Sequence, residues 1–201
     1  MTILPIDEIN AMKDRLQVHF TEDSDNVGEE RIGKGRIKSR EDAEDIIDEL
    51  LDLFLLSYAN GATATNSELG TAEMPSVDAV DAAVNKPVAG KTWRDRVMEY
   101  YESGGTLYDI IRIAETDATR IYNQGAVDAV RANGAEDSVQ KRWQTMEDDR
   151  VRDTHSYLQG MVVPFDSEFW TWDGDHAEYP GGFILPENNI NCRCVVEVIR
   201  G

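Results

Sequence analysis

Apolar residues recur at helical spacing through the first two thirds of the chain and change to an alternating pattern after that. In the N-terminal stretch they stand three or four residues apart with charged residues between them, which predicts an amphipathic helix over residues 6–20. Ser39 is a good helix N-cap, followed by Glu41 and Asp42 in the first turn, where the helix dipole favours acids. The apolar series after it predicts a helix ending at Asn60-Gly61. Its inward positions are Ala43, Ile46, Ile47, Leu50, Leu51, Phe54 and Tyr58.

The C-terminal half of this second helix is apolar on all sides. It also carries Leu53, Leu55 and Leu56. An apolar helix surface is either deeply buried or in contact with a partner, so we expect one of these two situations here.

Three further helices are predicted beyond a small-residue segment, 62–75, that has no periodicity. Ser76 begins a short helix that ends before Pro87, and Thr92 begins another that ends at Gly104-Gly105. A longer helix extends from Thr106 to Asn133-Gly134. Its packing face is formed by Leu107, Ile110, Ile111, Ala114, Ala118, Ile121, Gly125 and Ala129.

The opposite face of this long helix is polar and allows two interpretations. Arg112, Thr116, Thr119 and Asn123 fall within a narrow arc, with Arg120 beside it. They form either a hydrogen-bonding strip or an ordinary solvent-exposed surface.

Residues 139–145 alternate apolar and polar side chains, which predicts a strand. Asp148 or Asp149 is expected to cap a short helix containing Val151, His155 and Leu158, with Gly160 as its terminator. Further strands are predicted over 161–163, 169–172 and 192–199, with a turn at Asp173-Gly174. Cys192, Cys194, Val196 and Val198 would share one face of the last strand.

The predicted fold class is therefore α+β: an N-terminal helical region, then a long helix, then a small, mostly antiparallel sheet with a short helix. We divide the chain into 1–61, a helical region expected to bind a partner; 62–92, a linker with a short helix; and 93–201, the domain that carries the motif described below.

Charge narrows the functional classes. With 39 acidic and 20 basic residues the 201-residue chain has a formal net charge of -19, which disfavours a general DNA-coating role. One segment differs, because residues 31–40 are basic and contain no acid: Arg31, Lys34, Arg36, Lys38 and Arg40. This segment is either a flexible arm that contacts phosphate or an acidic partner, or a solvated linker whose charges offset the acidic flanks.

The sequence has no apolar run of the ~20 residues needed to span a bilayer, and Met1–Glu8 does not resemble a secretory signal. We therefore expect synthesis in the cytoplasm. Cys192 and Cys194, the only cysteines, would lie ~6.6 Å apart along an extended strand, near the upper limit for a disulfide, so we expect reduced thiols.

Those two thiols and His155 are three candidate zinc ligands. A structural zinc site needs a fourth ligand, for which Asp149, Asp153 and His176 are candidates. Without a metal, the cysteines can act as small buried apolar residues, or one of them can pair with His155 as a nucleophile.

Two other polar groups in this region have candidate roles. The Asp173, Asp175 and His176 group can bind a cation or perform acid-base chemistry, or it can simply form a turn. Arg193 would point away from the cysteines and could pair with Asp148, Asp149 or Asp153, forming a clasp between the short helix and the last strand.

One order of residues in this region resembles a known family. It comprises Trp143, Asp149, Arg152, His155, Gly160, Asn191, Cys192, Arg193 and Cys194. The run resembles the phage Mu F-like minor head proteins, also called phage head morphogenesis proteins, and the similarity extends over about Trp93–Ile199. The resemblance implies a low-copy virion component inside the capsid, associated with the portal protein, that acts in head assembly or in handling packaged DNA. It implies no catalytic activity.

The resemblance also bears on the metal. Some relatives have Cys-x-x-Cys where Arg152 and His155 stand here, and a His where this chain has Asn189, which together imply a full ligand set. This chain keeps His155, Cys192 and Cys194, so we expect a clasp of hydrogen bonds and ion pairs and no cofactor. The alternatives are a zinc-held adaptor, or a small hydrolase or toxin-like effector that uses His155 with Cys192 or Cys194, or the Asp173, Asp175 and His176 group.

Overall fold

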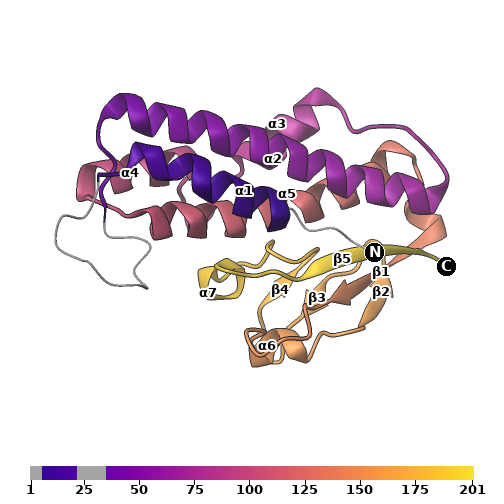
Figure 1. Ribbon diagram of the computed structural model, residues 1–201. Coiled ribbons are helices and arrows are strands. Elements are labelled where there is room, and N and C mark those ends of the chain that lie inside the picture. The colour runs from indigo at the N-terminus through magenta and orange to yellow at the C-terminus, as the bar shows by residue number, and fades with distance from the viewer. Residues whose placement is uncertain (1–5, 22–34) are drawn as a thin grey trace.

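In the computed structural model, which describes residues 6–21 and 35–201, a layer of helices lies against a smaller β module (Figure 1). The helical layer comprises α1 (Ile6–Leu16), α2 (Arg40–Leu69), α3 (Val77–Asn85), α4 (Trp93–Ser103) and α5 (Leu107–Ala132). The β module comprises β1 (Val139–Gln144), α6 (Asp153–Ser156), β2 (Val162–Pro164), β3 (Phe169–Trp170), β4 (His176–Ala177), α7 (Pro186–Asn189) and β5 (Val195–Arg200). The predicted α+β class is confirmed.

Helix α2 begins where the sequence predicts but does not end there. The hydroxyl of Ser39 accepts a hydrogen bond from the Asp42 N–H at 3.1 Å, as an N-cap should. The expected end at Asn60-Gly61 is wrong, because the helix continues to Gly70, which has the left-handed φ of 66°. Residues 62–69, expected as loop, are therefore helical.

Gly61 has a packing role instead of a terminating one. A Cβ atom built on Gly61 would lie 1.9 Å from the carbonyl oxygen of Tyr122, and one built on Gly125 would lie 2.3 Å from the carbonyl oxygen of Tyr58. The two glycines thus allow α2 and α5 to approach closely, which no larger residue permits.

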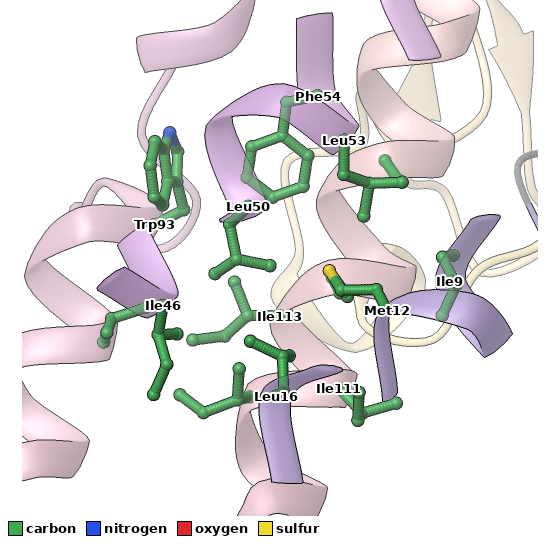
Figure 2. Packing of buried hydrophobic residues seen from close by; sticks show 14 of the residues in the cluster. Ile9, Met12, Leu16, Ile46, Leu50, Leu53, Phe54, Trp93, Ile111 and Ile113 are labelled. Carbon is green, nitrogen blue, oxygen red and sulfur yellow. The ribbon is translucent and has the colours of Figure 1, made fainter. Parts of the chain in front are cut away.

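An apolar core fills most of the helical layer (Figure 2). Ile9, Met12 and Leu16 of α1 point toward side chains of α2 and α5, so the predicted first helix is confirmed as a docked element over most of its length. Phe54 and Trp93 meet edge to face with ring centroids 5.1 Å apart. This core contains residues of the region 1–61, which we expected to bind a partner, and residues from Ala83 onward, so the two regions pack together.

The apolar end of α2 is only partly buried, and contact of its exposed part with a partner stays a prediction. Leu53 is buried, whereas Leu55 and Leu56 are each 43% exposed, so the fold does not bury these two side chains.

The described part of the basic segment pairs with neighbouring backbone. Ile37 forms an isolated antiparallel bridge with Phe20, and Arg36 forms one with Thr106. Arg31 and Lys34 lie outside the described residues.

The β module contains a three-stranded antiparallel sheet in the order β2-β1-β5 and a β3-β4 hairpin. The predicted last strand begins later than expected, at Val195, so both cysteines precede it. The predicted strand over 169–172 is confirmed only for Phe169–Trp170, and Gly174 occupies the expected turn with φ 90°. Within the described residues no helix is long and apolar enough to cross a membrane.

Candidate functional site: the His–Cys cluster and the polar strip of helix α5

The structure brings His155, Cys192 and Cys194 together in the interior of the β module. The Nδ1 atom of His155 lies 3.6 Å from the Sγ atom of each cysteine, and all three side chains are buried. Both cysteines are free, in agreement with the expected reduced thiols. The cluster is enclosed by aromatic rings: Trp143 contacts His155 edge to face at 5.5 Å, and Phe183 stacks on it at 5.2 Å.

The short helix that carries His155 differs from the predicted one. The short helix α6 spans only Asp153–Ser156, and its N-cap position is Arg152, not Asp148 or Asp149. Val151 and Leu158 therefore lie outside it. Gly160 adopts φ 72° and donates its N–H to the Trp143 carbonyl at 2.8 Å, which returns the chain to the edge of β1.

The two neighbouring buried thiols have pKa values shifted in opposite directions. A hydrogen bond from Cys194, followed by the neighbouring His155, lowers the pKa of Cys192. The hydrogen bond with Cys192, together with burial, raises the pKa of Cys194. Burial of both thiols keeps solvent and substrates away from them.

The three donors fit part of a zinc site. With Zn–N of about 2.0–2.1 Å and Zn–S of about 2.3 Å, a tetrahedral site has an N···S edge of roughly 3.5 Å, close to the 3.6 Å found here. Among the described residues, the cluster of potential ligands contains these three and no carboxylate. Asp149 and Asp153 are exposed, and His176 pairs with Glu168. A cavity of about 10 Å³ adjoins the donors, room for one water at most.

Two arginines tie the cluster's loop to its surroundings. Arg193 forms a bidentate pair with the Asp148 carboxylate at 2.8 and 2.6 Å, which lowers the pKa of Asp148. Arg152 donates to the carbonyls of Asn188 at 3.3 Å and Ile190 at 2.6 Å. Asp149, the acid in the motif, is exposed and has no part in this bidentate pair.

Asn191 connects this loop to helix α5. It has φ 57°, in the left-handed region that asparagine tolerates better than most residues, and its N–H donates to the Thr116 hydroxyl at 3.0 Å. The backbone conformation at this position therefore explains why asparagine suits it.

The polar face of α5 is a hydrogen-bonding strip and largely not a solvent-exposed surface. Thr116, Thr119, Arg120 and Asn123 are all buried. Asn123 donates to the carbonyls of Pro180 and Cys194, each at 3.0 Å, and accepts from the Val196 N–H at 2.8 Å. Helix α5 is therefore buried on two sides, by the helical core and by the β module.

Arg120 and Arg112 of this strip have different partners. The Arg120 guanidinium donates to the Ala83 carbonyl at 2.9 Å and pairs with the buried Asp117. Arg112 is the more exposed of the two and donates to the Tyr100 hydroxyl at 2.7 Å.

The Asp173, Asp175 and His176 group is not assembled as an acid-base site. Asp175 is buried and accepts from the backbone N–H groups of Ile184 and Leu185, both at 3.2 Å, and from the Asn188 amide at 2.8 Å. His176 instead stacks on Trp170 with centroids 4.3 Å apart. The role of Asp175 is to hold the loop that leads to α7.

Sequence reasoning missed Lys141. It is fully buried in β1, its ammonium donates to the Glu178 carbonyl at 3.0 Å, and it lies over the rings of Phe165 and Phe169. Burial lowers its pKa to about 8. The sequence pattern could have predicted this burial, because Lys141 alternates with Val139 and Trp143 on the buried face of the strand.

Comparison with known proteins supports the resemblance seen in the motif. A family model described as "Phage Mu protein F like protein" matches residues 82–197. The minor head protein GP7 of Bacillus phage SPP1 is 28% identical over 89 residues, which is 44% of this chain and 29% of that protein.

A second relative has a different name. The NAD(+)–arginine ADP-ribosyltransferase EFV of Enterococcus faecalis is 27% identical over 180 residues, covering 72% of this chain and 36% of that protein. The chain thus spans about a third of the length of these curated relatives. No solved structure matches it.

The matched region contains α4, α5, β1, the His–Cys cluster and the first half of β5, so the family match and the folded module coincide over more than half of the chain. This chain therefore belongs to the phage Mu protein F like family, as its motif indicated.

Proposed function

We propose that this chain is a minor head protein that acts in phage head assembly, located inside the capsid in low copy number and associated with the portal protein. The observation that carries the proposal is the family match over residues 82–197. The name of GP7, a minor head protein, agrees with it. The β module then provides a rigid platform, and the helical layer provides the contact with another head protein.

A structural role also fits the chemistry better than catalysis does. A nucleophile must reach its substrate, but His155, Cys192 and Cys194 are each at most 3% exposed. Asp175 is fully engaged with backbone N–H groups. The transferase name of the Enterococcus faecalis relative belongs to a protein of which this chain covers 36%. We therefore assign the cluster a clasp role, with zinc as an addition that the three donors permit.

The partner surface that the helical layer offers is the exposed apolar pair Leu55 and Leu56. Neighbouring apolar side chains left outside the core of a helix are typical of protein contact sites. Removing residues 1–61 would not test this surface, because Ile46, Leu50 and Phe54 belong to the core and their loss would unfold the layer.

Point substitutions provide a sharper test. In co-expression with the cognate portal protein, the double variant Leu55→Asp/Leu56→Asp is expected to lose co-purification while keeping the wild-type unfolding midpoint, because both positions are exposed. The matched control is Trp170→Ala/Trp172→Ala, which alters exposed apolar residues of the β module. Undiminished association of the leucine variant would refute this placement of the partner surface, and no association of the wild-type chain would refute the portal as partner.

Contact with packaged DNA is the second part of the proposal. The support for it is the acid-free segment 31–40, of which Arg36, Lys38 and Arg40 are described. Phosphate contacts make binding weaken steeply with salt, so a mobility shift with duplex DNA should disappear between 50 and 200 mM salt. Five contacts, one for each cation of the segment, would lower the affinity on the order of 500-fold over that range. Salt-insensitive or absent binding at 50 mM would exclude it.

A further inference from the structure

A cavity of about 550 Å³ lies where the helical layer meets the β module. Its walls come from α1 and α5 on one side and from the loops around residues 150–152 and 191–193 on the other. Both sets of loops belong to the module drawn beneath the helices in Figure 1. A ligand held here would contact both layers at once.

The lining is cationic in a strongly acidic molecule. The five basic side chains are Lys13, Arg112, Arg150, Arg152 and Arg193. The opposing carboxylates are Glu115 in the wall and Asp109 and Asp148 behind it, as partners of Arg112 and Arg193. Five cations against three anions, in a chain of net charge -19, make a local positive region that attracts anions over a short range.

Several of these cations keep donors for a ligand. Arg152 is bonded to backbone carbonyls, which leave its full charge in place. Arg150 is 73% exposed, and its Nε atom is 3.8 Å from the Asp148 carboxylate, too long for a strong hydrogen bond. The Lys13 ammonium is likewise 3.8 Å from Glu115. Guanidinium groups that line one cavity are suited to bidentate contact with phosphate.

The rest of the wall is apolar and includes an aromatic ring. Leu107, Tyr108 and Ile111 line the α5 side, and Tyr108 is 60% exposed, so its ring face is open to stacking. The volume falls in the range of about 300–1,000 Å³ that is usual for small-ligand pockets. A ligand that satisfies both walls has one phosphate and one planar ring.

We propose that this cavity binds a nucleoside monophosphate, with its phosphate on Arg150 and Arg152 and its base against Tyr108. The inference is independent of the head-assembly role, since it rests on the lining of the cavity and not on the family. Binding would also join the two layers, because Arg150 and Arg152 come from the module and Tyr108 from α5.

Calorimetric titration of the full chain at low salt tests it with three probes: adenosine monophosphate, adenosine and inorganic phosphate. Adenosine monophosphate is expected to bind at least tenfold more tightly than either fragment and to raise the unfolding midpoint. Arg150→Gln should weaken its binding roughly tenfold by removing a charge-assisted contact, and Tyr108→Ala about fivefold by removing the stacking surface. Both residues are exposed, so the variants should fold.

Arg15→Gln is the matched control, because it removes the same charge outside the cavity: Arg15 is 56% exposed and pairs with Glu49. It should leave binding unchanged. Equal affinities for adenosine monophosphate and phosphate would overturn the nucleotide assignment. No binding at millimolar nucleotide, or equal losses in Arg150→Gln and Arg15→Gln, would overturn the site itself.

Discussion

Replacement of Asn123 by Ala should be the most destabilising single polar substitution on the face of α5 that meets the β module. Asn123 is fully buried, and its amide serves three backbone groups: the carbonyls of Pro180 and Cys194 and the N–H of Val196. Each buried group left without a partner costs about 1–3 kcal/mol. For three groups we therefore expect a loss of roughly 3 kcal/mol or more, a large part of the 5–15 kcal/mol typical of a whole domain.

The measurement is urea unfolding followed by tryptophan fluorescence, in which this loss should move the midpoint down by about 1–2 M. The matched control is Asn85→Ala, because within the described part of the chain the Asn85 amide bonds only to Asp81 in its own helix. That variant should change the free energy of unfolding by less than about 1 kcal/mol. A loss below about 1 kcal/mol for Asn123→Ala would show that the strip on α5 does not hold the module.

Four further outcomes are expected. Lys141→Met should raise the free energy of unfolding at pH 7 by about 1–3 kcal/mol, because burial lowers the Lys141 pKa from 10.5 to about 8. As pH rises, the folded state loses this proton before the unfolded state does, so wild-type stability should rise between about pH 8 and 10.5 and the advantage of the variant should shrink. A stability difference that does not change with pH would contradict the argument. Asp148→Asn should remove a stabilising contribution that is present above about pH 4 in the wild type and is lost as pH falls through the lowered pKa of Asp148. The free energies of unfolding of wild type and variant should therefore become equal in acid. A difference that persists at about pH 2 would count against the Arg193 pair. His155→Ala should cost about 2–5 kcal/mol whereas a chelator leaves the wild-type midpoint unchanged, and a fall of the midpoint on chelation would mean that a metal holds the cluster. Gly61→Ala should cost about 1–3 kcal/mol or more through the clash with the Tyr122 carbonyl, while Ser67→Ala at an exposed position of the same helix should be neutral; a neutral Gly61→Ala would refute the close contact of α2 and α5.

Local sequence determined most of the helical part of this protein. Apolar spacing and caps were enough to locate α4 and α5, because Thr92 and Thr106 form capping boxes and Gly104 takes the left-handed φ of 82° that glycine allows. Alternation located β1, and the order of residues from Trp143 to Cys194 was enough to indicate the family.

Tertiary structure decided what periodicity does not encode. Gly61 has the same local signature whether it ends a helix or lets a second helix approach, and only the position of Tyr122 distinguishes the two. Asn123 likewise lies on a polar face that would suit water, but the module covers it and replaces water with backbone groups. A hydrophobic pattern tells which face of an element is apolar; it does not tell which partner covers the other face, because that depends on residues distant in sequence.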